Sequence, residues 1–155
     1  MKVSDNCIKL IEHFEGCYLK AYKCPAGVWT IGIGTTLYAN GIRVKEGDEI
    51  TIEQAYQELY DELEQKAETV DSYTRDTIEQ YEFDALVSFA YNVGLSALKN
   101  SRLLIKVNAN APGADISKQF NRWIYGGGQI LPGLVRRRLS EAYLYNTGVL
   151  KFEFV

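Results

Sequence analysis

The chain has 155 residues, of which 46% are hydrophobic and 24% are charged, and these values are typical of a globular domain. This composition excludes a disordered chain, a collagen-like chain and a disulfide scaffold. The net charge of −3 argues against a general nucleic-acid coat. No apolar run approaches the ~20 residues of a membrane span, and the first 20 residues lack the uninterrupted apolar stretch of a signal peptide.

The first 45 residues predict a helix followed by a small sheet. Apolar residues at helical spacing predict a helix from residue 4 or 5 to about 14, ended by Gly16. Apolar residues alternate with threonine and glycine over residues 29–34, which predicts a strand. The dipeptide Asn40-Gly41 predicts a tight turn. We therefore expect a small hairpin sheet over about residues 18–44.

The rest of the chain predicts helices. Thr51 and Gln54 form a capping box before an apolar stripe that reaches about residue 73. Residues 46–84 hold 14 acidic and two basic side chains, which is typical of a solvated helix. Residues 83–93 are apolar nearly all round and predict a buried helix. Shorter helices are predicted over about residues 102–107, 115–125 (capped by Asp115) and 132–145, with a flexible break at residues 126–128.

These elements predict an α+β fold, mostly helical, in which a long helix joins a small N-terminal sheet lobe to a helical C-terminal lobe. We expect a single domain over residues 1–155. Within it we expect the sheet lobe at about 15–50, the connecting helix at 51–73 and the helical lobe at 74–155, with the first helix packed on the helical lobe. A polymer would bind in a cleft between such lobes.

Three cysteines lie within the first 24 residues: Cys7, Cys17 and Cys24. An odd number without a signal peptide favours free thiols in a reducing compartment. The only histidine, His13, suits a solvated helix flank and has no convincing partner for a Ser-His-Asp or Cys-His mechanism. We expect neither a metal site nor a cofactor.

The spacing of Glu15, Cys24 and Thr30 points to a catalytic site. Glu15 lies where the first helix ends, beside apolar neighbours that would partly desolvate its carboxyl, as a general acid requires. Eight residues separate Glu15 from Cys24, and five separate Cys24 from Thr30. A helix end, a turn and a hairpin can bring these three side chains together.

This pattern resembles the phage-type lysozymes and endolysins of glycoside hydrolase family 24. Their pattern is Glu, eight residues, Asp or Cys, five residues and Thr, within A-Y-x-C/D-x-x-G-x-W-T-I-G-x-G, which matches residues 21–34 here. The stretches FDALVSFAYNVG (83–94), WIYGGG (123–128) and PGLVRRR (132–138) are also similar to family segments. The resemblance covers essentially the whole chain.

The resemblance implies a lysozyme-like fold and a muramidase that cleaves the β-1,4 bond between N-acetylmuramic acid and N-acetylglucosamine. Glu15 would be the proton donor, and Thr30 would hold the attacking water. Cys24 would stand in for the second carboxylate as nucleophile or base, which leaves an inverting or a retaining course open. Weaker candidates for substrate binding are Tyr22, by stacking on a sugar, and Gly127, in a mobile rim. Family alignment places Arg137 where an arginine salt-bridges the catalytic glutamate.

The resemblance also implies a biological setting. The enzyme would be made in the host bacterial cytoplasm and act on periplasmic peptidoglycan during host lysis, which would require a separate membrane-permeabilising protein. We expect a monomer that binds no nucleic acid and does not insert stably into membranes. Two alternatives stay open. One is a lytic transglycosylase, which needs one acid/base carboxyl and no positioned water. The other is a non-catalytic peptidoglycan-binding homologue.

Overall fold

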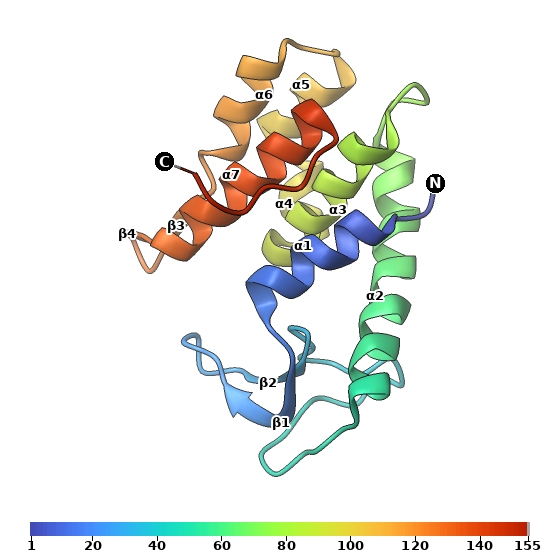
Figure 1. The fold of residues 1–155 in the computed structure, drawn as a ribbon, viewed down its shortest axis with the longest axis vertical. Helices are drawn as coiled ribbons and strands as arrows, with labels where there is room; N and C mark the ends of the chain where they lie inside the picture. The colour runs from blue at the N-terminus through green and yellow to red at the C-terminus, as the bar shows by residue number, and fades with distance from the viewer. Residues whose placement is uncertain (155) are drawn as a thin grey trace. The chain divides into compact units, whose positions relative to one another are not determined.

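The computed structural model describes residues 1–154 (Figure 1). The chain folds into two compact units. We call residues 11–65 the sheet unit, and residues 1–10 together with the chain from residue 66 onward the helical unit. Helices dominate and the strands are short, which confirms the predicted α+β class. Among the described residues, no helix is both long and apolar enough to cross a membrane.

The elements have the following bounds in chain order: α1 Asp5–Glu15, β1 Tyr18–Lys23, β2 Trp29–Gly32, α2 Ile52–Tyr73, α3 Gln80–Val93, α4 Leu95–Lys99, α5 Arg102–Asn108, α6 Gly113–Phe120, β3 Tyr125–Gly126, β4 Gln129–Ile130 and α7 Pro132–Thr147.

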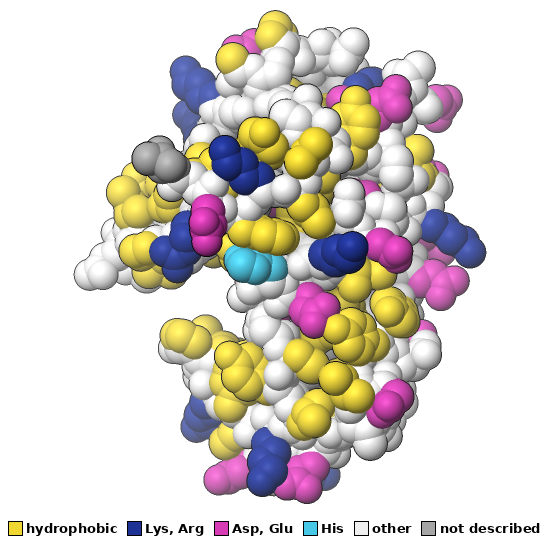
Figure 2. Space-filling model, in the orientation of Figure 1, with side chains coloured by type: hydrophobic (Ala, Val, Ile, Leu, Met, Phe, Trp, Pro, Cys, Tyr) yellow, Lys and Arg dark blue, Asp and Glu magenta, His cyan; other side chains and the backbone are white. Residues whose placement is uncertain are grey.

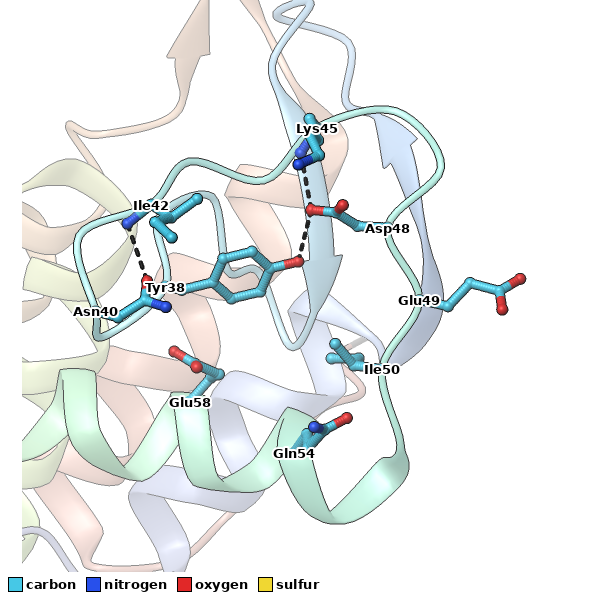
Figure 3. A pocket seen from close by; sticks show the side chains of 9 residues that line it. All are labelled: Tyr38, Asn40, Ile42, Lys45, Asp48, Glu49, Ile50, Gln54 and Glu58. Atoms are coloured by element: carbon cyan, nitrogen blue, oxygen red, sulfur yellow. Dashed lines mark hydrogen bonds between the residues drawn. The ribbon is translucent and has the colours of Figure 1, made fainter.

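In the sheet unit, β1 and β2 form an antiparallel pair, and the loop that follows them closes on itself. The predicted turn is present, since the Gly41 amide donates to the Tyr38 carbonyl at 2.9 Å. The Tyr38 hydroxyl donates to Asp48 Oδ2 at 2.9 Å, and the Lys45 amide donates to the same oxygen at 3.1 Å (Figure 3). The Lys45 and Tyr38 hydrogen bonds lower the pKa of Asp48. These carboxylate contacts hold the loop around a hollow of about 330 Å³.

Helix α2 begins as the sequence predicts. The Thr51 amide donates to Gln54 Oε1 at 2.8 Å, and the Gln54 amide donates to Thr51 Oγ1 at 3.2 Å, which is a capping box. Its predicted apolar stripe is buried: Ala55, Leu59, Leu63, Ala67 and Val70. β2 lies against α2 at Gly32, where a Cβ would be 3.4 Å from Ala55, an ordinary van der Waals distance.

The core of the helical unit forms around α3, which packs chiefly against α7 (Figure 1). Residues 83–90 are all buried, as the apolar sequence predicts. Helix α3 begins three residues earlier than expected, because Glu79 and Glu82 form a capping box ahead of the apolar run. Phe89 contacts Phe120 edge to face, with ring centroids 5.7 Å apart.

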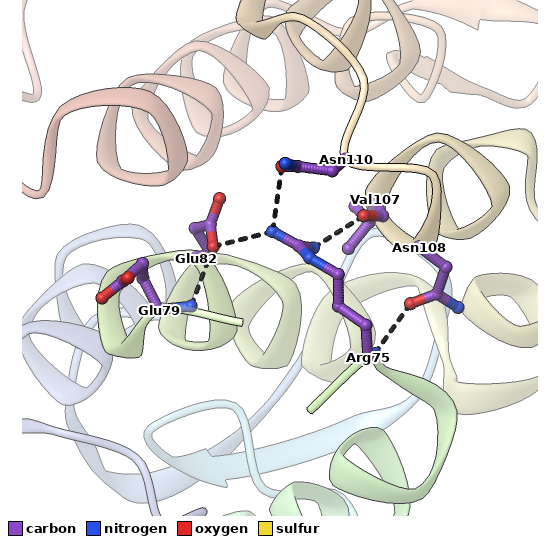
Figure 4. A network of polar contacts seen from close by, with 6 residues as sticks. All are labelled: Arg75, Glu79, Glu82, Val107, Asn108 and Asn110. Carbon is purple, nitrogen blue, oxygen red and sulfur yellow. Dashed lines mark hydrogen bonds and ion pairs between the residues drawn. The ribbon is translucent and has the colours of Figure 1, made fainter. Parts of the chain in front are cut away.

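Arg75 ties the segment after α2 to the rest of the helical unit (Figure 4). Its guanidinium donates to the Val107 carbonyl at 2.6 Å and to Asn110 Oδ1 at 3.3 Å. The same group pairs with Glu82 Oε1 at 3.2 Å. Both partners of this ion pair are largely buried. The network joins α3 to the end of α5 and to the segment that follows α5.

Two sequence predictions in the helical unit are wrong. Helix α6 begins at Gly113, with Pro112 at its N-cap, so Asp115 lies inside the first turn and does not cap the helix. It ends at Phe120, before the predicted end at about residue 125. The predicted break at residues 126–128 lies in a short hairpin, in which β3 pairs with β4 and the turn residues Gly127 and Gly128 have φ of +58° and +80°. Two successive positive φ values suit a tight hairpin turn, and glycine adopts them without strain.

Candidate active site

The β1–β2 hairpin places three candidate side chains on one face. Tyr22 pairs directly with Thr30, and Cys24 lies two residues beyond Tyr22. Because side chains alternate across a strand, Tyr22 and Thr30 share a face, and the hydrogen bond from the Thr30 side chain places the Cys24 thiol beside them. Lys23 and Trp29 form the next pair and lie on the other face, where Lys23 Nζ is 5.5 Å from the Trp29 ring centroid.

Cys24 begins the turn of this hairpin and is half-buried. The Cys24 amide donates to the Val28 carbonyl at 3.0 Å, and the Gly27 amide donates to the Cys24 carbonyl at 2.8 Å. Hydrogen bonds from the backbone of Val28 and Ala26, together with one from the Thr30 side chain, lower the pKa of the Cys24 thiol. This turn therefore stabilises a thiolate at Cys24.

Thr30 is buried at 5% exposure, with its hydroxyl beside the turn. The hydroxyl donates to the Val28 carbonyl at 3.0 Å. A hydroxyl has one proton and two lone pairs, so Thr30 donates either to the Val28 carbonyl or to the Cys24 thiolate, and in both cases it can accept a hydrogen bond from a water.

Glu15 is the last residue of α1 and is half-buried. The helix end is held within the sheet unit because the Tyr56 hydroxyl donates to Glu12 Oε1 at 2.6 Å. That bond raises the pKa of Tyr56 to about 12. Gly34 lies against the carboxyl, since a Cβ there would lie 2.9 Å from Glu15 Oε2.

The electrostatics of Tyr22 link Glu15 to the hairpin face. Burial raises the pKa of the Tyr22 hydroxyl, and the nearby Tyr18, Glu15 and Cys24 raise it further. Glu15, Tyr22, Cys24 and Thr30 thus all lie in the sheet unit, and Glu15 and Cys24 are both near enough to Tyr22 to raise its pKa. On the face shown in Figure 2, hydrophobic side chains gather over the sheet unit. Exposed apolar residues of this unit include Tyr18, Leu19, Val28, Leu37 and Ile42.

Arg137 and Gly127 belong to the helical unit, so their predicted roles at the site stay predictions. Arg137 is buried, with Nε 3.3 Å from Glu141 Oε2 and a hydrogen bond of 3.2 Å to the Ser88 carbonyl. The neighbouring Arg138 is also buried and pairs with Glu141. Gly127 is exposed in the β3–β4 turn.

Comparison with known proteins places the chain in a family. The phage lysozyme family model matches residues 12–141. The chain belongs to the phage lysozyme family. Among phage lysozyme relatives, the endolysin of Bacillus phage PZA is 38% identical over 151 residues, which cover 97% of this chain and 57% of that protein. The endolysin of Acyrthosiphon pisum secondary endosymbiont phage 1 is 36% identical over 152 residues, covering 95% of this chain and 99% of that protein.

A solved phage lysozyme structure has the same fold. The endolysin from Escherichia coli O157:H7 phage FAHEc1 superposes with a TM-score of 0.90 at 35% identity, covering 97% of each chain. This confirms the predicted lysozyme-like fold. The chain spans little more than half the length of the Bacillus phage endolysins that it matches.

The sequence predicted Glu15, Cys24 and Thr30 as the reacting groups but gave Gly34 no role. Gly34 is the last residue of the family-like stretch 21–34. The available signal was the pair of glycines in the strand pattern, Gly32 and Gly34. A glycine within a strand pattern often marks a place where another part of the protein comes close to the backbone. That the partner is the carboxyl of Glu15 follows only from the three-dimensional structure.

Proposed function

We propose that this phage lysozyme is a muramidase that hydrolyses the β-1,4 bond between N-acetylmuramic acid and N-acetylglucosamine in peptidoglycan. The observation that carries the proposal is the site in the sheet unit. There a half-buried Glu15 lies near a hairpin face with a thiol of lowered pKa at Cys24 and a buried hydroxyl at Thr30. Glycoside hydrolysis needs a proton donor for the leaving oxygen and a second group that supplies or activates the nucleophile.

Glu15 is the proposed proton donor. Its carboxyl protonates the glycosidic oxygen as the bond from that oxygen to the anomeric carbon breaks, and the carboxylate that remains later regains a proton. Gly34 supports this role because its backbone restricts the volume open to the Glu15 carboxyl. A donor held in one place loses less freedom on reaching the transition state.

Cys24 and Thr30 are the proposed second group, and two routes fit their arrangement. In the first, Thr30 accepts a hydrogen bond from a water, and the Cys24 thiolate takes the proton of that water as it attacks the anomeric carbon. In the second, the thiolate attacks directly, and water later displaces it. The first route inverts the anomeric configuration and the second retains it, so the anomer of the first product separates them.

The proposed substrate is the peptidoglycan of a host bacterium during lysis. The matched relatives named endolysins support this setting. We propose that the enzyme accumulates in the host cytoplasm and reaches the wall with the help of a membrane-permeabilising protein. It would act as a monomer.

Clearance of a cell-wall suspension tests the proposal. The wild-type chain should lower the turbidity of purified peptidoglycan, and Glu15→Gln should lower that rate by about 10²-fold or more, because the amide keeps the shape but donates no proton. Circular dichroism checks that the variant is folded. An unchanged rate in a folded Glu15→Gln variant would overturn the assignment, and a wild-type chain that binds the wall without clearing it would favour a binding homologue.

A further inference from the structure

Tyr18 and Tyr22 form a close aromatic pair beside the candidate site. Their ring centroids are 4.5 Å apart, and the ring planes are inclined at 52°. Both residues belong to β1, and Cα atoms four residues apart in a regular strand lie about 13 Å apart, so a straight strand would hold the two rings well apart. Tyr18 is 49% exposed, so burial in the hydrophobic core does not explain the contact.

A bend in β1 brings the two rings together. The register of β1 against β2 shifts between Tyr18 and Tyr22, where three residues of β1 oppose one residue of β2. In this interval the Ile50 amide donates to the Leu19 carbonyl at 2.9 Å, so β1 pairs there with the segment that precedes α2. Extra residues on one strand of a pair bend that strand, and this bend sets the Tyr18 ring against Tyr22.

The Tyr18 ring also lies against the residue that follows the proposed proton donor. A Cβ at Gly16 would lie 2.9 Å from Tyr18 Cε2 and 3.4 Å from Tyr18 Cζ. The Gly16 amide donates to the Glu12 carbonyl at 2.8 Å, so Gly16 is fixed to the last turn of α1. Because Gly16 is bonded directly to Glu15, the ring braces the backbone from which the Glu15 side chain extends.

Tyr22 connects the same ring to the second group of the candidate site. It pairs with Thr30 across the hairpin, and the Thr30 side chain hydrogen-bonds the Cys24 thiol. Burial raises the pKa of the Tyr22 hydroxyl, and the nearby Glu15 and Cys24 raise it further. Tyr18 therefore contacts both the end of α1 and the hairpin face that holds the thiol.

We propose that Tyr18 is a positioning residue for the glycosidase, whose ring keeps Glu15 and the hairpin face at Tyr22 at a fixed separation. The inference rests on the proposed function, because this separation matters only if Glu15 and Cys24 act on the same glycosidic bond. A misplacement of about 1 Å can cost on the order of 10²-fold in rate. The Tyr18 ring carbons make the closest contacts, so phenylalanine should serve in its place.

Steady-state rates on soluble glycan strands from peptidoglycan test the proposal. Tyr18→Ala should lower kcat at least about tenfold and change KM by less than about twofold, because the reacting groups are displaced while the substrate binds as before. Tyr18→Phe keeps the ring and should keep the wild-type kcat. The matched control is Tyr60→Ala, which removes a ring of similar exposure, 44%, that pairs with Tyr56 in α2, and it should keep both constants.

NMR measures the positioning itself without a substrate. The carbon signals of the Glu15 carboxyl and of Cys24 Cβ should both shift in Tyr18→Ala and stay unchanged in Tyr60→Ala. Circular dichroism checks that each variant is folded, and Tyr18→Leu replaces Tyr18→Ala in both assays if the alanine variant is unfolded.

The outcomes separate this inference from the proposed function. A raised KM with an unchanged kcat would make Tyr18 a sugar contact and overturn the proposal, and so would an equal loss of kcat in Tyr60→Ala. Unshifted signals of Glu15 and Cys24 in Tyr18→Ala would overturn it as well. If both signals shift but the wild-type chain does not cleave the glycan, the proposed function fails, and the coupling of the two groups through Tyr18 stands.

Discussion

Gly34 and Glu15 are in such close contact that no other residue fits at position 34 without moving the carboxyl. A Cβ at Gly34 would lie 2.9 Å from both Cδ and Oε2 of Glu15, well inside van der Waals contact. The backbone of Gly34 also has a φ of +76°, which favours glycine. The proposed proton donor is therefore positioned by a backbone segment two residues beyond β2.

Gly34→Ala should strongly lower the rate of wall clearance while leaving the protein folded. The methyl group must displace the Glu15 carboxyl, and a misplacement of about 1 Å can cost on the order of 10²-fold in rate. Backbone strain should lower the free energy of unfolding by about 1–2 kcal/mol. Turbidity assays and urea unfolding measure the two effects.

Gly41→Ala is the matched control. Gly41 has a similar φ of +87°, but a Cβ there meets nothing within 4 Å. This variant should show a similar loss of stability and keep nearly all activity. Equal loss of activity in both variants would mean that strain, and not contact with Glu15, explains the effect.

Cys24 should be the most reactive of the three thiols. Hydrogen bonds from the Val28 backbone lower its pKa, whereas burial raises that of Cys17. Burial also raises the pKa of Cys7 well above its usual value. Since the thiolate is the reacting form, alkylation of Cys24 by iodoacetamide should begin at a lower pH than alkylation of Cys17, and Cys7 should stay unmodified in the folded protein.

Peptide mass spectrometry across a pH series measures this order and its effect on activity. Loss of wall clearance should follow modification of Cys24 and be independent of Cys17, which Cys17→Ser tests directly. A fully alkylated Cys24 with unchanged clearance would remove the thiol from the mechanism.

Substitutions at Cys24 should separate charge from packing. Cys24→Asp places a carboxylate that is ionised at neutral pH and acts as a base or nucleophile. Cys24→Ser keeps the size, but its hydroxyl stays neutral, so we expect a rate at least about tenfold below that of Cys24→Asp. Steady-state rates on one peptidoglycan preparation measure this, and equal activity of the serine variant and the wild type would assign the sulfur to packing.

Glu141→Gln should strongly destabilise the fold. Glu141 is 0% exposed and lies 2.9 Å from Arg138 Nε and 3.3 Å from Arg137 Nε. Removing one partner of a buried ion pair typically costs about 3–5 kcal/mol, because the remaining charges lose their compensation. Urea unfolding checks this against Glu68→Gln, an exposed α2 position that should change stability by less than about 0.5 kcal/mol. A near-neutral Glu141→Gln would contradict the buried network.

Elements with local signals were predictable from the sequence. The Thr51–Gln54 capping box and the apolar stripe of α2 can be recognised in the sequence, because their residues are three or four positions apart. The structure confirms both. The β3–β4 hairpin was missed because two-residue strands are too short to show a period of two. The burial of Arg137 and Arg138 was not predicted either. Glu141, four and three residues further on, was the available signal for that buried pairing.

The candidate site was also only partly predictable from the sequence. The spacing of Glu15, Cys24 and Thr30 predicted the reacting groups, and hairpin register explains why Tyr22 and Thr30 share a face. The role of Gly34 depends on the path of the backbone after β2, which residue spacing does not encode. The turn amides that favour the Cys24 thiolate depend in the same way on hairpin geometry.

The reducing ends released from purified peptidoglycan test the central claim most directly. Hydrolysis adds water across the bond, so mass spectrometry of the wild-type digest should show muropeptides that end in reducing N-acetylmuramic acid. The Glu15→Gln variant should release these reducing-end muropeptides at a rate lower by a factor on the order of 10² or more. Muropeptides that end in 1,6-anhydro-N-acetylmuramic acid would contradict hydrolysis and identify a transglycosylase, in which the hydroxyl of the sugar itself replaces water.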